Sequence, residues 1–322
     1  TGQCTRPSAK VEIKFTSKNP HHGIPQMLKV RYPCGAKGVL VLVMLLTITA
    51  CSGTRFFYNR LDTLIDWYVD DYVTLNREQS ADFQGRIDQL LDWHRREELP
   101  SYAHLLTNFE RNLDPSLDPE AVKTLFAELS AAADRLEVRI LDLMIDFGAT
   151  LTFAQRQEFM LALEDEQDEQ RERLLSRSDE AYRKNVEEQF ADNLSKFLGR
   201  LTESPKETLA LYTPDYQRFD GVWIEDRARW TAELSDVIAR DTASWPSEVH
   251  GVLVRREAAR SPEYVAVYAH NSALSQAIFT EVINLRTPKQ DRRLRRKIDD
   301  YRGDFTALVA QAQPFSPTAI NP

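Results

Sequence analysis

Residues 118–148 read DPEAVKTLFAELSAAADRLEVRILDLMIDFG, and this stretch decides the fold class of the chain. Asp118 occupies the position of a helix N-cap, and Pro119 fills the first helical position, where its missing N–H is not needed. Apolar side chains then recur every three or four residues on one face: Val122, Leu125, Phe126, Leu129, Leu136, Ile140, Leu143 and Met144. The stretch predicts a long amphipathic helix over about 120–147, with Gly148 marking its end.

The same helical period recurs along most of the chain after residue 54. Asn76, Thr152 and Thr287 are each followed three residues later by glutamine, a pattern that predicts capping boxes at three helix starts. Pro100 is expected to break or kink the helix that begins near residue 77. No useful length of sequence alternates like a strand. The sequence therefore predicts an all-α fold, a multi-helix bundle of about eight to ten helices, preceded by a lipoprotein signal peptide.

One helical stretch has an unusual composition. Residues 164–173 (EDEQDEQRER) contain ten polar side chains in a row and no apolar one. Because such a stretch cannot line a hydrophobic core, we expect an exposed helical arm there.

The N-terminal part has the layout of a secretory signal peptide. Small residues follow the apolar run GVLVLVMLL at 38–46, and three basic residues precede it: Lys29, Arg31 and Lys37. The run is about a dozen residues long, short of the ~20 that a helix needs to cross a bilayer. Residues 27–50, which begin at the first methionine of the chain, are therefore predicted to be a signal peptide.

The end of this segment, Ile48-Thr49-Ala50-Cys51, resembles a bacterial lipobox, in which the cysteine receives a lipid and becomes the mature N-terminus. The resemblance implies lipidation of Cys51. Cleavage there would remove Cys4 and Cys34, so no disulfide partner would remain. In lipoproteins of this kind an aspartate after the cysteine commonly signals inner-membrane retention, and Ser52 in that place favours the outer membrane. The expected location is the periplasmic face of a Gram-negative cell envelope.

These patterns predict how the chain is divided. Residues 1–26 lack periodicity and are interpreted as an upstream extension or an extended n-region, and residues 27–50 are the signal peptide. Residues 51–313 are expected to form a single helical domain, with a possible sub-boundary near 201–214, and residues 314–322 an irregular, proline-containing tail.

The charge of the mature chain limits its partners. The full sequence has 41 basic and 49 acidic residues; seven basic residues and one acidic residue precede Cys51, which leaves a formal charge of −14. Nucleic acid favours proteins of net positive charge, so it is excluded as a partner. Anionic lipid headgroups are disfavoured as the main attachment for the same reason, and the membrane is expected to be reached through the lipid on Cys51.

Three segments carry a resemblance to a known family: FYNRLD at 57–62, WYVDDY at 67–72 and WHRREELP at 93–100. They resemble uncharacterised proteobacterial lipoproteins, a domain of unknown function, over most of the mature chain. The resemblance implies a helical domain and a lipid anchor, and it supplies no catalytic residue. Leu151-Thr152-x-x-Gln155 is also similar to the motif of the Spy and CpxP periplasmic chaperones. The same positions form a capping box in any helical protein, so both interpretations stay open.

A possible binding surface is expected where acidic, basic and aromatic side chains gather in two of these segments. Its residues are Asp66, Trp67, Tyr68, Asp70, Asp71, Tyr72, Trp93, His94, Arg95 and Arg96. Carboxylates beside aromatic rings could hold a cationic ligand. In the alternative interpretation the aromatic rings belong to the core and the carboxylates pair with arginines.

Enzyme signatures are missing from the sequence, which contains no Gly-x-Ser-x-Gly, P-loop, Rossmann, Glu-x-x-His or zincin motif. The leading prediction is a lipid-anchored protein that binds an unknown envelope protein or an unfolded client, in a scaffold or chaperone-like role, without a cofactor. The rival is a periplasmic hydrolase or metal-dependent enzyme with a site around His94 and the carboxylates of Asp66, Asp70 and Asp71.

Overall fold

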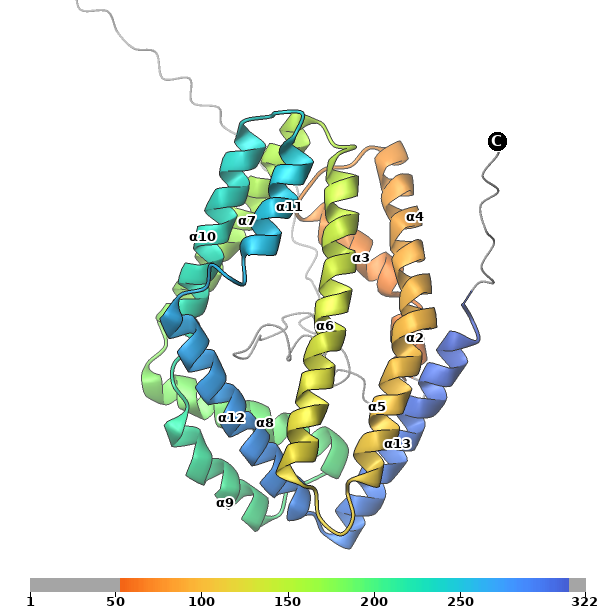
Figure 1. Ribbon diagram of the computed structural model, residues 1–322, viewed down its shortest axis with the longest axis vertical. Helices are drawn as coiled ribbons and strands as arrows, with labels where there is room; N and C mark the ends of the chain where they lie inside the picture. The colour runs from red at the N-terminus through yellow and green to blue at the C-terminus, as the bar shows by residue number, and fades with distance from the viewer. Residues whose placement is uncertain (1–52, 313–322) are drawn as a thin grey trace, which may run out of the picture. The chain divides into compact units, whose positions relative to one another are not determined.

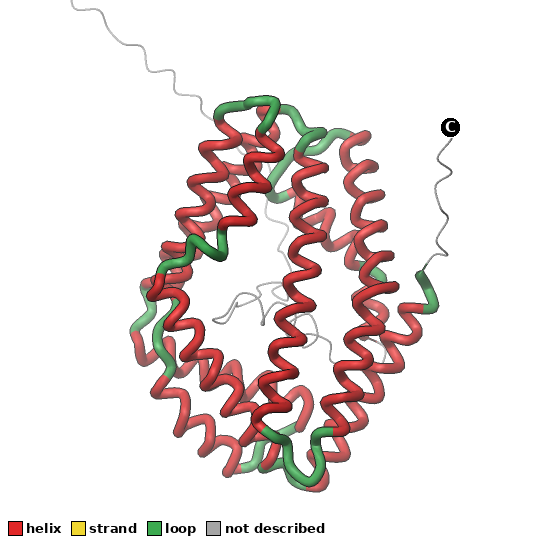
Figure 2. The backbone as a smooth tube through the Cα atoms, in the orientation of Figure 1, coloured by secondary structure: helices red, strands yellow, loops and turns green. Residues whose placement is uncertain are grey.

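The computed structural model describes residues 53–312, and every regular element within that range is helical (Figures 1 and 2). The α-helices are α2 (Gly53–Tyr58), α3 (Leu61–Asp70), α4 (Arg77–Trp93), α5 (Leu99–Arg111), α6 (Pro119–Gly148), α7 (Phe153–Leu175), α8 (Asp179–Leu198), α9 (Glu203–Tyr212), α10 (Asp220–Ala239), α11 (Trp245–Arg255), α12 (Pro262–Asn284) and α13 (Pro288–Val309). The prediction of an all-α fold is confirmed, with somewhat more separate helices than expected.

Side chains at the helix starts explain where several helices begin. Asn76, Thr152 and Thr287 each accept a hydrogen bond from the backbone three residues on, and the glutamine there reaches back to the cap. Asp118, the residue directly before Pro119, accepts a hydrogen bond from the backbone N–H of Glu120. These contacts satisfy N–H groups that have no partner inside the helix. The predicted capping boxes are confirmed.

Two stretches with a helical pattern are interrupted in the structure. Residues 55–72, at the start of the part of the chain with helical period, divide at residues 59–60 into α2 and α3. Between α4 and α5 the chain forms a π-helical turn, His94–Glu98, directly ahead of Leu99 and Pro100. Proline removes a backbone donor and crowds the preceding turn of a regular helix. The wider π turn accommodates Pro100, so the path continues into α5 instead of breaking.

The buried core joins helices that are distant in sequence. One cluster lies among α6, α8, α12 and α13: Val122, Tyr182, Leu198, Ile278, Ile283 and Ile298. A second lies among α4, α5, α6 and α13: Phe83, Ile87, Tyr102, Phe147 and Phe305. Figure 1 shows α6, the longest helix, passing α12 near its start and α11 near its end. Leu201 and Leu209, from the predicted sub-boundary, belong to the first cluster.

The polar stretch 164–173 is not the exposed arm that the sequence predicted. It forms the second half of α7, which packs along α10. The Gln170 side chain is buried, and Gln167 donates a hydrogen bond to Thr231 of α10. Polar side chains can therefore fill a helix interface when they are hydrogen-bonded to one another.

The predicted signal peptide, the lipidation site Cys51 and the tail 314–322 lie outside the described residues. Between residues 53 and 312, no helix is both long and apolar enough to pass through a bilayer.

Candidate functional site

The first half of the predicted surface lies on α3 and the turn after it. Trp67 and Tyr68 are 65% and 57% exposed. The hydroxyls of Tyr68 and Tyr72 lie 2.7 Å apart, and Tyr72 donates to the carboxylate of Glu166 on α7. Burial, and then the hydrogen bond to Glu166, raises the pKa of Tyr72, so its hydroxyl stays a donor. Tyr72 thus connects the α3 region to α7.

The Asp66 carboxylate on α3 lies close to other acidic groups. The Gln84 amide on α4, with its nitrogen toward the carboxylate, donates to Asp66. Burial, and then the charges of Asp70 and Asp62, raises the pKa of Asp66. Within residues 53–312, Asp66, Asp70 and Asp71 form no ion pair, so the pairing with arginines considered from the sequence is not found. No three His, Cys, Asp or Glu residues in that range are grouped as a metal site.

The second half of the predicted surface lies around the π turn, and its residues contact other helices than those of the first half. Trp93 lies 5.1 Å from the Arg139 guanidinium of α6. Arg96 pairs with Asp92 at 2.6 Å, and the Arg95 guanidinium lies 5.2 Å from the centre of the Tyr58 ring of α2. The contacts of this half lead to α2, α6 and the end of α4, whereas those of the first half lead to the middle of α4 and to α7. The structure therefore gives the two halves different environments.

His94 belongs to the core and does not face solvent. Its side chain is 7% exposed, its Nδ1 lies 2.8 Å from the Tyr58 hydroxyl, and its ring packs edge-on against Tyr102. Burial lowers the pKa of His94 to about 4, against the opposing effect of Glu98. At neutral pH the imidazole is therefore uncharged and is held between two tyrosines.

Glu98, at the end of the π turn, is also buried. Its side chain is 3% exposed, and its two oxygens accept from Nε and Nη2 of Arg135 at 2.7 and 2.8 Å. The Arg135 side chain is half exposed. This two-pronged contact attaches the π turn to α6 and neutralises the carboxylate.

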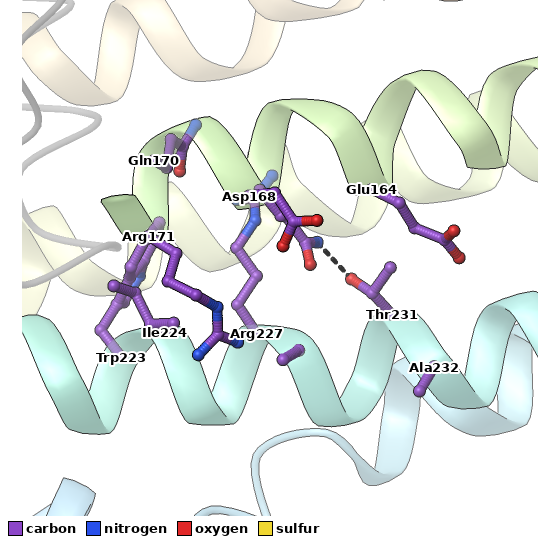
Figure 3. Close-up of a pocket in the computed structure, with 11 residues that line it drawn as sticks. Glu164, Asp168, Gln170, Arg171, Trp223, Ile224, Arg227, Thr231 and Ala232 are labelled. Atoms are coloured by element: carbon purple, nitrogen blue, oxygen red, sulfur yellow. Dashed lines mark hydrogen bonds between the residues drawn. The ribbon is translucent and has the colours of Figure 1, made fainter. Parts of the chain in front are cut away.

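A cleft lies between α7 and α10 (Figure 3). It has a volume of about 280 Å³. Its lining includes Glu164, Asp168 and Arg171 from α7, and Trp223, Arg227 and Thr231 from α10. Gln167 and Thr231 both line the cleft, and a hydrogen bond from Gln167 to Thr231 joins the two helices there.

Two arginines line this cleft. Figure 3 shows Arg171 and Arg227 extending from opposite helices into the space between them. Within the described part of the chain neither forms an ion pair, although Glu164 and Asp168 line the same cleft. Guanidinium groups recognise carboxylates and phosphates through paired N–H donors, so the cleft can bind an anion.

Aromatic rings hold one of these guanidinium groups in place. The Arg227 guanidinium lies 5.4 Å from the Trp223 ring and 5.9 Å from the Trp230 ring. Its Nε is buried and has no hydrogen-bond partner among residues 53–312. The cation–π contacts orient Arg227 without using its donors.

A chain of hydrogen bonds connects the cleft to part of the predicted surface. Gln170, which lines the cleft, donates to Glu166 at 2.8 Å, and Glu166 also accepts from Tyr72. Tyr72 in turn is hydrogen-bonded to Tyr68.

The sequence analysis did not identify Arg171 and Arg227 as site residues, because it placed the polar stretch 164–173 on an exposed arm. The tryptophans spaced along α10 were the one sequence feature that could have indicated a site there.

One comparison with known proteins gives a match. A model described as a family of unknown function (DUF6279) matches residues 71–265, which is more than half of the chain and includes both cleft helices. No curated protein and no solved structure was found to be similar to the chain.

Proposed function

The chain belongs to the DUF6279 family of unknown function, and from that premise we propose that it is a lipid-anchored protein of the cell envelope that acts by binding. The α7–α10 cleft is its binding site, and it receives an anionic group of the partner. The observation that carries this proposal is the pair of arginines, Arg171 and Arg227, that enter one cleft from two helices and form no ion pair with any residue between 53 and 312.

The size of the cleft supports a side-chain-sized occupant. Its volume of about 280 Å³ is slightly below the roughly 300–1,000 Å³ of pockets that hold drug-sized ligands, so the cleft suits a small group. An aspartate, glutamate or C-terminal carboxylate of a protein partner fits both this volume and the paired donors of arginine. A scaffold or chaperone-like role agrees with such a contact.

The lipid anchor rests on the sequence before the described residues. Basic residues, an apolar run and a small-residue stretch ending at Cys51 occur in the order of a lipoprotein signal. The periplasmic face of the envelope, at the outer membrane, is the location that this anchor supports.

The enzymatic alternative has less support from the geometry. It needs His94 and the carboxylates of α3 around one accessible site. His94 is 7% exposed and bonded to Tyr58, whereas Asp66 is bonded to Gln84. A group that is to transfer a proton must reach its substrate.

Photocrosslinking from the cleft tests the binding proposal. Ala228, which lines the cleft, is replaced by the photoreactive residue benzoylphenylalanine. The full-length variant is expressed in the cells that naturally produce the protein. The matched control places the same residue at Ala154, an exposed position of α7 near its start. We expect a discrete crosslinked partner from position 228 and none from position 154.

A variant that removes one charge tests whether the arginines of the cleft are needed to bind the partner. Arg171→Gln removes one exposed guanidinium with little effect on folding and should strongly reduce the adduct at position 228. An adduct that is unchanged by Arg171→Gln, or equal at both positions, would contradict an anion-binding cleft.

A further inference from the structure

Helix α2 is attached to the core by one face and presents two phenyl rings on the other. Tyr58 and Thr54 are buried, and Tyr58 bonds to His94 at 2.8 Å. Phe56 and Phe57 are 55% and 49% exposed and contact each other edge-on, 5.7 Å between ring centres.

Ionic and cation–π contacts fix the orientation of this helix. Arg55 of α2 pairs with Asp304 of α13, Nε to Oδ1, at 2.9 Å. The Arg60 guanidinium lies 4.8 Å from the centre of the Phe56 ring. These contacts, together with the buried Tyr58, favour an orientation of α2 in which the two phenyl rings face outward.

The place of these rings in the chain suggests what covers them. α2 begins at Gly53, two residues after Cys51, and an extended chain gains at most about 3.6 Å per residue. Helix rise adds about 1.5 Å per residue, so Phe56 and Phe57 lie within roughly 15 Å of the residue expected to carry the lipid. The headgroup layer on each side of a bilayer is about 5–8 Å deep, and aromatic side chains on interfacial helices enter it.

We propose that Phe56 and Phe57 insert into the headgroup region of the phospholipid membrane that holds Cys51. This inference rests on the proposed lipid anchor and adds a second attachment, which fixes how the helical domain faces the membrane. The Arg60 guanidinium beside Phe56 would then contact lipid phosphates while the ring enters the headgroup layer. Carboxylates of α3, Asp62, Asp66 and Asp70, disfavour a strongly anionic surface, so the membrane is one of zwitterionic headgroups.

Spin labels measure whether the rings enter the membrane. After Cys51 the sequence contains no cysteine, so Phe56→Cys and Phe57→Cys each give a single labelling site and each leave the other ring in place. The lipidated whole protein is reconstituted in phosphatidylethanolamine–phosphatidylcholine vesicles, and its mass is checked for acylation. Phe153→Cys is the matched control, since Phe153 is an exposed phenylalanine (41%) at the start of another helix.

Collision rates with oxygen and with a water-soluble nickel complex report the depth of each label. We expect nickel accessibility to be lost and oxygen accessibility to rise at positions 56 and 57, with no such shift at 153. Labels that stay water-accessible in acylated protein would overturn this proposal and leave the lipid anchor intact. An unacylated chain in the mass measurement would overturn the anchor itself. Protection that appears without vesicles and grows with protein concentration would assign the rings to a second copy and also overturn the proposal.

Discussion

Replacing Arg135 by methionine should destabilise the fold, because it leaves the Glu98 carboxylate buried without a partner. The Glu98 side chain is 3% exposed and is held by two hydrogen bonds of 2.7 and 2.8 Å from Arg135. Removing one partner of a fully buried ion pair costs about 3–5 kcal/mol. Here the arginine side chain is 49% exposed, so water can replace part of the lost contact. We expect a loss of about 2–3 kcal/mol in the free energy of unfolding.

The assay is urea unfolding followed by circular dichroism, with a double-mutant cycle. Because Arg135→Met and Glu98→Met together remove the pair without leaving a charge, the double variant should be more stable than Arg135→Met alone, with a coupling of at least about 1 kcal/mol. The control is Arg86→Met, which breaks an exposed i,i+4 pair with Asp82 and should cost less than about 0.5 kcal/mol. An Arg135→Met loss no larger than that of the control, or a double variant no more stable than the single one, would refute the reasoning.

Three further predictions concern stability. Burial lowers the pKa of His94 in the folded chain to about 4, below the ordinary histidine value of about 6.5, so protons bind the unfolded chain first as the pH falls. Stability should drop by about 2 kcal/mol between pH 7 and pH 5, and His94→Gln should flatten that dependence in unfolding curves. Thr152→Ala removes the cap of α7 and should cost about 1 kcal/mol by urea unfolding, whereas Thr152→Ser should be nearly neutral. Gly199→Ala should cost about 1 kcal/mol or more in the same assay. Residue 199 has φ +76°, and the new Cβ would lie 3.2 Å from the Arg293 side chain. An unchanged unfolding midpoint would mean that the backbone at residue 199 relaxes freely.

Local sequence patterns predicted most helix starts and the class of the fold. Asn76, Asp118 and Thr152 cap helices through contacts with residues two or three positions away, which a single stretch of sequence contains in full. The division of 55–72 was not predictable in this way. It accompanies contacts with distant residues, Tyr58 with His94 and Tyr72 with Glu166.

The candidate site depended on neighbours that the sequence does not show side by side. The polar stretch 164–173 gave no apolar stripe, so its packing against α10 could not be inferred from periodicity. Arg171 and Arg227 lie 56 positions apart, and only the pairing of their helices brings them to one cleft. The acidic and aromatic residues around Asp66 and Trp93 were predicted to form one surface because of their composition. In the structure the two groups contact different helices.

The lipid anchor is the claim on which the location, the second membrane contact and the choice of partners all depend. Intact-mass analysis of the protein purified from membranes of cells expressing the whole sequence tests it most directly. The predicted result is a chain that starts at Cys51 and carries the added mass of acyl groups on that residue. An unmodified chain that starts before the apolar run at 38–46 would contradict it.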